Sequence, residues 1–241
     1  MSSARRVFCP KIESKLVFIE GDEHKHISVV LRCKVGDAVV VWCGDGFDYH
    51  GVVVEIKKSH TVVDIVQKSK TLAEPKINVT LYMGILKNTD RMEFAIQKCI
   101  ELGVSKIVPF ISKNSVAKYV NVSRMNKIVL NAVKQCGRSV LVPIDEPCSF
   151  VHVLEQLSSQ ETVMFAYEKA TFPICEKLQT DIFLNATQIS VVVGSEGGFD
   201  VEEIAKLNHK NIVPIKLGQR ILRAETASIA VMSLLSLTLN I

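Results

Sequence analysis

The chain has 241 residues, of which 48% are hydrophobic, and a formal net charge of +4. This length allows one large domain or two smaller ones, and the mild charge neither requires nor excludes a nucleic-acid partner. The longest apolar stretch, Ile229 to Leu239, is too short to span a bilayer, so no membrane partner is expected. The cysteines lack zinc-binding spacing, which predicts no metal site. Their odd number and the polar start of the chain, without a signal peptide, favour the reducing cytoplasm.

Residues 5 to 66 carry β-branched runs separated by turn residues, a pattern typical of short β-strands. Apolar residues at helical spacing predict one helix between Asp22 and Arg32. About five short strands and one helix indicate a small barrel. The polar segment Lys68–Lys76 contains a proline and is the expected linker. The clearest predicted strands are Val39–Trp42, Gly51–Ile56 and Thr61–Val66.

The middle of the chain is basic and shows no matching acids. A solvated helix face is the commoner explanation for such a run, and a phosphate-contacting surface is the alternative. The residues concerned are Lys68, Lys70, Lys113, Lys118, Arg124, Lys127, Lys134 and Arg138.

After the linker, apolar strands alternate with helices, which predicts an α/β domain with a parallel sheet. Asp200 and Glu203 have the spacing of a capping box at the start of one helix. The predicted strands are Ile77–Leu86, Lys106–Ile111, Thr162–Tyr167, Ile189–Gly194 and Ile212–Leu217. The predicted helices are Asp90–Leu102, Ser123–Gln135, Asp200–Leu207 and Ala224–Leu239.

Two segments in the last quarter of the chain combine an apolar run, a glycine and a helix start: Val191–Phe199 and Leu217–Ala227. Apolar runs suit parallel strands that are covered on both faces. Glycine at a strand end lets the backbone approach a ligand closely or adopt a positive φ. Because ligands of open α/β sheets bind beyond the carboxyl ends of strands, the two segments predict one small-molecule site built mainly from backbone.

Common catalytic and nucleotide-binding motifs are absent from the sequence, including the P-loop, a complete dinucleotide fingerprint and a Ser-His-Asp arrangement. A glycine turn such as Gly194–Gly198 is by itself more often structural than functional. The second segment is more specific, because it places Arg220, Arg223 and Glu225 within a strand-to-helix turn. Charges are rarely buried without partners, so an ion network at the helix start is the alternative explanation.

Further motifs occur along the chain at Arg6–Phe8, His26–Arg32, Arg91–Gly103 and Gln135–Arg138. Together with the two glycine segments, they resemble the bacterial 16S rRNA uridine-N3 methyltransferases, known as the RsmE family, of the SPOUT (α/β-knot) class. The number, order and spacing of the motifs argue against a chance match. One departure is Ser195, where the family usually has proline; we expect it to loosen the turn without abolishing cofactor binding.

This resemblance implies a two-domain enzyme. Residues 1–70 would form a PUA-like RNA-binding β-barrel, and residues 76–241 would form an α/β-knot methyltransferase domain. The second domain would combine a parallel sheet with a deep trefoil knot, a rare exception to unknotted chain connections. The resemblance also implies S-adenosyl-L-methionine as the cofactor, 16S rRNA of the small ribosomal subunit as the partner, and a homodimer. The apolar helix from Ala227 to Leu239 would supply either dimer surface or core.

The implied reaction requires N3 of uridine to lose a proton while charge develops on its carbonyl oxygens. Fixed donors stabilise such charge, and Arg220, Arg223 or Arg138 would serve. Glu196 and Glu225 are the candidate bases. The alternative for either glutamate is to hold the loop by accepting backbone N–H bonds.

The resemblance also implies binding roles. For His26 a half-buried structural role is the alternative, and for Arg91 a solvated helix position. Expected cofactor contacts are Gly194, Glu196, Gly197, Gly198, Leu217, Gly218, Ile221, Leu222 and Ala227. Expected RNA contacts are Arg5, Arg6, His26, Arg32, Arg91, Lys98 and Arg138.

Two other functions compete with this one. Ribose 2′-O-methyltransferases of the same class share the glycine turn but usually carry a Ser-Leu-Asn-type sequence at the last helix start, where this chain has Ala224–Ala227. A non-catalytic RNA-binding assembly factor is the second rival. The intact glycine loops disfavour it, because a binder has no need of a cofactor turn.

Overall fold

The computed structural model describes residues 5–157, 162–171, 173–174, 178, 183, 185–207 and 212–239. Cys175, one of the cysteines considered above, lies outside the described residues. Contacts within the chain divide it into two compact units, which are described separately. Unit 1 comprises Met1–Glu74 and Val133–Leu141, and unit 2 comprises Pro75–Ala132 and Val142–Ile241. The second part of unit 1 is thus a short segment from the middle of the chain.

Unit 1 contains a mainly antiparallel sheet. Within the fully described stretch 5–157, five of its strands pair in the order β1-β3-β4-β5-β2, with β1 parallel to β3. The three strands singled out in the sequence are confirmed. The strand bounds are β1 (Arg6–Phe8), β2 (Leu16–Glu20), β3 (Ala38–Trp42), β4 (Phe47–Ile56) and β5 (His60–Lys70).

The core of unit 1 follows from residue alternation along these strands. In β2, Val17 and Ile19 are buried while Leu16 and Phe18 face outward. The inward residues join a cluster that includes Ile27, Val41 and Val63. One face of the sheet therefore carries the apolar core of this unit.

The helix predicted between Asp22 and Arg32 is present but changes its winding. It consists of α1 (Gly21–Lys25) followed directly by the π-helical turn η1 (His26–Val30). The chain then leaves the helix, and Arg32 adopts a left-handed backbone with φ of 50°. Wider π-turns of this kind occur mostly as single insertions in helices, often at functional sites.

The expected linker begins later than its polar composition suggested. Strand β5 continues to Lys70, and Lys68 pairs with Tyr49 of β4. The Lys68 ammonium lies 4.0 Å from the ring centre of Phe47 and 4.8 Å from that of Tyr49. A lysine stem packs well along such apolar surface, so these polar residues belong to the sheet.

Five of the basic residues in the middle of the chain have acidic partners, contrary to expectation. Lys134 lies 2.8 Å from Glu23, and Arg138 lies 2.9 Å from Glu74. Other pairs are Lys113 with Asp200, Lys68 with Asp45, and Arg124 with Glu93. Several of these partners are far apart in the sequence; Arg124 and Glu93, for example, are separated by 31 positions. Only the folded chain brings them together.

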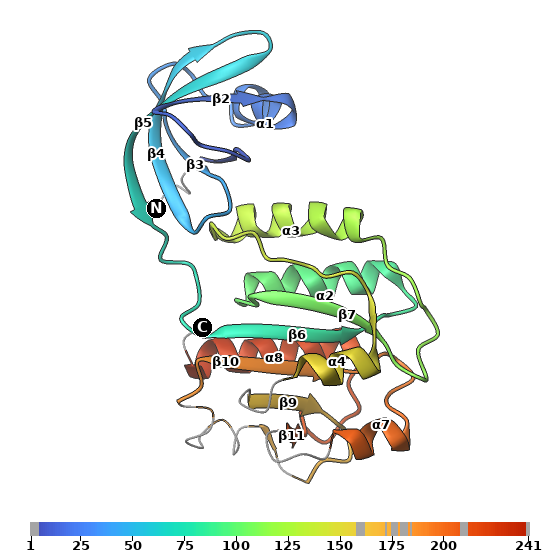
Figure 1. Cartoon of the computed structure of the whole chain (residues 1–241). Coiled ribbons are helices and arrows are strands. Elements are labelled where there is room, and N and C mark those ends of the chain that lie inside the picture. Colours follow the sequence, from blue (N-terminus) through green and yellow to red (C-terminus); the bar gives the residue numbers. More distant parts are fainter. Residues whose placement is uncertain are drawn as a thin grey trace. The chain divides into compact units, whose positions relative to one another are not determined.

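Unit 2 is an α/β structure whose described part contains a six-stranded parallel sheet in the order β11-β9-β10-β6-β7-β8 (Figure 1). This confirms the expected fold class and all five predicted strands. The short β8 and helix α4 were not predicted. The strands are β6 (Asn78–Gly84), β7 (Lys106–Ile111), β8 (Cys148–Ser149), β9 (Thr162–Ala166), β10 (Gln188–Val193) and β11 (Ile212–Ile215).

Helices cover both faces of this sheet. The four predicted helices are confirmed, with bounds that differ by a few residues at most. Among the described helices, none is long and apolar enough to cross a membrane. The helices of unit 2 are α2 (Thr89–Glu101), α3 (Val122–Cys136, whose last turn groups with unit 1), α4 (Phe150–Gln156), α7 (Val201–Lys206) and α8 (Ala224–Leu239).

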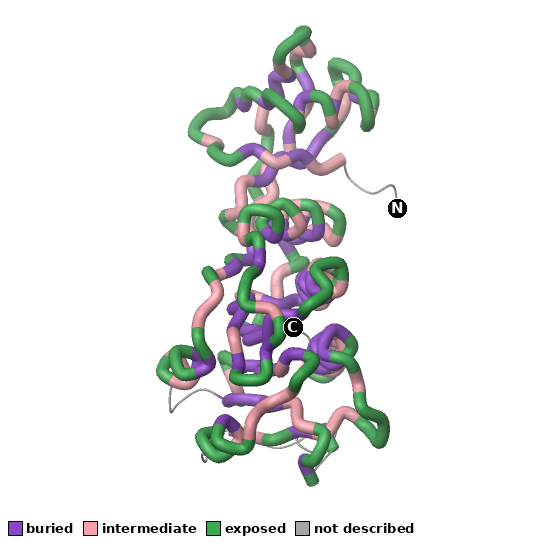
Figure 2. The backbone as a smooth tube through the Cα atoms, turned by 90° about the vertical axis from the view of Figure 1, so that its right-hand side faces the viewer, coloured by how far each residue is buried: buried purple, intermediate pink, exposed green. Residues whose placement is uncertain are grey.

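The alternation of side chains decides which helix covers which face. Tyr82, Val108 and Val192 point to one face and join a cluster with residues of α4 and α7. Helices α2 and α8 contact each other, and α8 also contacts β6 and β10; Figure 1 shows this pair on the side opposite α4 and α7. The strands between the two layers are mostly buried, as the purple trace in Figure 2 shows. That double cover explains their uninterrupted apolar sequences.

Candidate functional site

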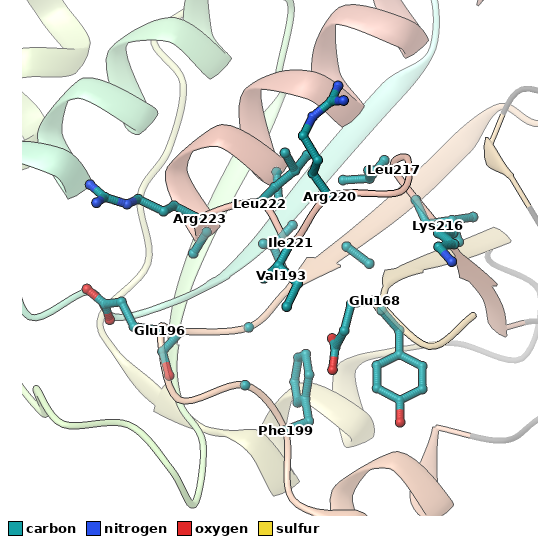
Figure 3. Close-up of a pocket in the computed structure, with 18 of the residues that line it drawn as sticks. Glu168, Val193, Glu196, Phe199, Lys216, Leu217, Arg220, Ile221, Leu222 and Arg223 are labelled. Atoms are coloured by element: carbon teal, nitrogen blue, oxygen red, sulfur yellow. The ribbon is translucent and has the colours of Figure 1, made fainter. Parts of the chain in front are cut away.

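A cavity of about 400 Å³ lies at the carboxyl ends of β9, β10 and β11, within unit 2 (Figure 3). These strands are neighbours in the sheet, so the residues that follow them meet at one edge. Gly197 and Gly218 both line the cavity, which confirms that the two glycine segments border one site. The size falls within the range of about 300–1,000 Å³ that is usual for small-molecule pockets.

All the residues expected to contact a cofactor line this cavity, although their individual roles stay predictions. Most contribute either backbone or an apolar side chain, as a backbone-built site requires. They are Gly194, Glu196, Gly197, Gly198, Leu217, Gly218, Ile221, Leu222 and Ala227.

Two glycines are needed here for distinct reasons. At Gly197 a Cβ atom would collide with the backbone oxygen of Asn114, so only glycine permits this close approach of two loops. Gly218 has a φ of 127°, a conformation that other residues rarely adopt. Local backbone geometry therefore depends on glycine in each of the two segments.

The loop after β7 holds the first glycine segment in place. The Asn114 side-chain amide donates to the Gly197 carbonyl at 3.3 Å, and the Ser115 hydroxyl donates to the Ser195 hydroxyl at 3.3 Å. Ser112, Ser115 and Ser195 are all buried. Buried hydroxyls that bond to one another in this way rigidify the backbone that carries them.

Glu196 holds the same segment from its other side. Its carboxylate oxygens accept the backbone N–H of Lys87 at 3.1 and 3.3 Å. In Figure 3 the Glu196 side chain is directed away from the cavity. This arrangement matches the loop-holding alternative for Glu196 rather than the role of a base.

Arg220 and Arg223 both line the cavity and are exposed. They belong to the segment between β11 and α8, where the Arg223 carbonyl accepts the N–H of Ala227 at 2.8 Å. Figure 3 shows their guanidinium groups directed away from each other at the cavity rim. Solvent-exposed guanidinium groups at this position are available to a ligand or to a second substrate.

Glu225 lies outside the cavity lining. The residue is buried, and its carboxylate oxygen Oε1 lies 3.7 Å from Nε of Arg91 on α2. Its second oxygen, Oε2, has no hydrogen-bond partner among the described residues. The alternative of an ion network among Arg220, Arg223 and Glu225 is therefore wrong for the described residues, because Glu225 pairs with Arg91 of α2 instead.

Several residues expected to bind RNA are instead engaged within the protein. Arg138 is 3% exposed, and both its Nε and its terminal nitrogen donate to Glu74, at 3.0 and 2.9 Å. Arg6 donates to Asp48 and to Ser139. Burial and pairing of this kind serve structure, so the expected RNA role of Arg138, and its alternative role as a donor to the reacting base, are corrected.

The remaining expected RNA contacts differ in availability. Arg5 pairs with Asp37, and Lys98 pairs with Glu101 on the same helix. Burial lowers the pKa of His26, and the nearby Lys134 lowers it further, which favours the uncharged imidazole. Arg32 is exposed beside the π-turn, and within the described residues it takes part in no ion pair.

The sequence interpretation missed the contribution of β9 to the site. Tyr167 and Glu168 follow this strand and line the cavity. Phe199, after β10, and Lys216, after β11, also line it. The signal was present, because β9 was predicted and its carboxyl end must lie beside those of its parallel neighbours. What the sequence lacked was the strand order.

The fold and the site place the chain in a class, that of the RNA methyltransferases. The family of RNA methyltransferase domains matches residues 73–236, a stretch that includes the whole cavity lining. The chain therefore belongs to that family.

Individual relatives narrow this class. The ribosomal RNA small subunit methyltransferase E of Mesomycoplasma hyopneumoniae is 35% identical over 73% of this chain and 77% of that protein. The protein of the same name from Rickettsia conorii is 30% identical over 90% of this chain and 88% of that protein. A solved structure of the Neisseria gonorrhoeae protein of this name, bound to S-adenosyl methionine, has a TM-score of 0.87, with 26% identity and 97% of both chains covered. The chain is a member of the ribosomal RNA small subunit methyltransferase E family.

Proposed function

We propose that this protein transfers a methyl group from S-adenosyl-L-methionine to N3 of a uridine in 16S rRNA of the small ribosomal subunit. The observation that carries the proposal is the single cavity formed by both glycine segments at the ends of three parallel strands. The relatives named for small-subunit rRNA methylation match along most of the chain and support the substrate. The cytoplasm, where rRNA is assembled, is the proposed location.

The residues present fit the proposed cofactor. Val193, Leu217 and Leu222 supply apolar wall for an adenine ring, and the glycine backbones leave amides and carbonyls free for its polar edges. Lys216 provides positive charge for a carboxylate, and Glu168 provides negative charge. When bound, S-adenosyl-L-methionine supplies the activated methyl group.

Arg220 and Arg223 are proposed to act on the uridine. N3 would lose its proton and take the methyl carbon as the carbon–sulfur bond of the donor breaks, which would leave S-adenosylhomocysteine. The negative charge of the deprotonated imide would spread over the two flanking carbonyl oxygens. A guanidinium at the cavity rim stabilises that charge and thus eases the loss of the proton to water. Their exposure at the rim suits a substrate that arrives from outside.

The two glutamates are proposed to position the site. Glu196 keeps the first glycine segment against the backbone of Lys87. Glu225 ties the first turn of α8 to Arg91 of α2. Each thereby fixes one of the two segments between which the cofactor binds.

For the domains we propose residues 1–70 as a PUA-like RNA-binding barrel and residues 76–241 as a SPOUT-type methyltransferase domain with a trefoil knot. The five-stranded sheet of unit 1, with exposed Arg32 beside its π-turn, supports the first. The return of α8 from the sheet edge at β11 to contacts with β6, β10 and α2 supports the second. A homodimer is proposed from the family resemblance.

A ribose 2′-O-methyltransferase is the alternative, and the product distinguishes it. Mass spectrometry of rRNA nucleosides from a deletion strain is expected to show loss of 3-methyluridine, restored by the intact gene. Unchanged 3-methyluridine together with loss of a 2′-O-methylated nucleotide would favour the alternative. A protein that gives no binding heat with S-adenosyl-L-methionine in a calorimeter would instead be an RNA-binding assembly factor.

Replacement of Arg223 tests the proposed chemistry. Arg223→Ala is expected to lower turnover about a hundredfold, because it removes a donor to the developing charge, while leaving the thermal unfolding midpoint unchanged. Lys127→Ala, an exposed position on α3 that does not line the cavity, is the control and should turn over normally. Full activity of Arg223→Ala would remove this arginine from the site.

A further inference from the structure

Glu168 occupies an unusual position at the cavity. It follows β9 in a turn held on both sides, because Tyr167 N–H donates to the Ile215 carbonyl at 3.0 Å and Ala170 N–H donates to the Tyr167 carbonyl at 3.1 Å. The backbone thus fixes where the side chain starts. In Figure 3 the Glu168 carboxylate is directed into the cavity, toward Phe199.

This carboxylate is the free negative charge of the cavity. Within the described residues, Glu168 takes part in no hydrogen bond or ion pair, whereas Glu196, the other lining acid, is bound to Lys87 N–H. Three cations, Lys216, Arg220 and Arg223, also line the cavity, yet none of them pairs with Glu168. Glu168 is exposed, so water solvates its charge, and a ligand that covers the carboxylate must supply a partner in place of that water.

We propose that Glu168 recognises the positive charge of the methyl donor, an inference that rests on the function proposed above. S-adenosyl-L-methionine carries two cations, the sulfonium that holds the methyl group and the α-ammonium of its amino acid. The cations that line the cavity repel both of these positive groups, so the unpaired acid of the lining decides whether a cationic ligand is preferred. Glu168 is therefore a specificity-determining residue for the charged cofactor over neutral adenosine compounds.

Calorimetry with Glu168→Gln tests this assignment. The ligands are S-adenosyl-L-methionine, S-adenosylhomocysteine, which keeps only the ammonium, and methylthioadenosine, which has neither cation. The variant is expected to bind S-adenosyl-L-methionine about tenfold more weakly, as is usual when a charge-assisted contact is lost, and to bind methylthioadenosine as the parent protein does. Equal losses for all three ligands, or no loss for any, would overturn the proposal.

The S-adenosylhomocysteine titration identifies the cation. A tenfold loss for this ligand as well assigns Glu168 to the ammonium, and an unchanged affinity assigns it to the sulfonium. Either result supports recognition of charge.

Glu202→Gln is the control, because it removes the same charge from unit 2 at an exposed side chain of α7 outside the cavity lining. This variant should show the same preference among the three ligands as the parent protein. If its preference changed as much as that of Glu168→Gln, the effect would come from the net charge of the protein, and the proposed contact of Glu168 with the ligand would be wrong. Thermal unfolding of both variants should match the parent protein, since Glu168 has no partner to lose among the described residues and Glu202 is exposed. If the parent protein binds none of the ligands, the proposed function fails too. If it binds all three and Glu168→Gln binds them equally well, only the inference fails.

Discussion

At the scale of single residues, Ser195 shows how a departure from a family pattern is accommodated. The family resemblance led us to expect proline here, a residue that restricts the backbone by itself. In this chain the Ser195 hydroxyl accepts a hydrogen bond from Ser115, whose own hydroxyl also contacts Ser112 at 2.9 Å. A buried hydrogen bond thus restrains the turn that was expected to be loosened.

Ser115→Ala is expected to weaken cofactor binding. The change leaves the buried Ser195 hydroxyl without its partner, a loss that costs about 1–3 kcal/mol. The double variant with Ser195→Ala should recover part of that loss, because removing both partners is less costly than removing one. Calorimetry with S-adenosyl-L-methionine measures both, and a double variant weaker than Ser115→Ala would contradict the role of this hydrogen bond.

At the scale of elements, the start of α7 is tied to the loop after β7. Asp200 and Glu203 form the predicted capping box, with Asp200 N–H donating to Glu203 at 2.9 Å. The second Glu203 oxygen accepts Lys113 N–H at 2.8 Å. Asp200 also pairs with the Lys113 side chain. The hydrogen bond from the Glu202 N–H lowers the pKa of Asp200 most, and the Lys113 ammonium lowers it further. The start of this short helix therefore fastens the loop after β7, at Lys113, to the chain that follows the first glycine segment, at Asp200.

Glu203→Ala is expected to lower the free energy of unfolding by about 2 kcal/mol, because two backbone N–H groups lose their acceptor. Glu202→Ala is the matched control: its side chain is 79% exposed, and surface changes of this kind stay within about 0.5 kcal/mol. Urea unfolding gives both values. Equal midpoints for the two variants would show that the capping box contributes nothing to stability.

At the scale of the whole molecule, remote parts of the chain come together around buried charge. Glu74 accepts hydrogen bonds from Arg138 and from the N–H groups of Ser139 and Val140. Arg6 donates to the Arg138 carbonyl at 3.0 Å, 132 residues away in sequence. The segment Val133–Leu141 thereby belongs to unit 1 although it follows a helix of unit 2.

Arg138→Met is expected to lower the free energy of unfolding of unit 1 by about 3 kcal/mol, because it leaves Glu74 buried without its cation. The double variant with Glu74→Gln should be less destabilised, since the uncompensated charge is gone. Denaturant unfolding followed at Trp42, a buried residue of unit 1, measures the change. Wild-type stability in Arg138→Met would mean that this pair is dispensable.

The sequence alone was sufficient wherever the signal is local. Periodicity placed five of the strands and four of the helices of unit 2 within a few residues but missed the short β8 and α4. A strand covered on both faces and a helix covered on one each require a fixed spacing of apolar residues. The capping box of α7 was predictable for the same reason, since both of its partners lie within one turn. The glycine segments also identified the cavity, because a tight turn at a strand end requires glycine whatever lies around it.

The tertiary structure alone decided what depends on contacts between distant residues. Arg138 and Arg6 were expected to contact RNA, but the structure places Glu74 and Asp48 beside them. The sequence analysis did not single out Glu168. The strand order β11-β9-β10 brings Glu168 to the cavity, and no local pattern encodes that order. Apolar periodicity reports only whether a residue is covered, whereas the partner of a charge and the neighbour of a strand are determined by how the whole chain packs.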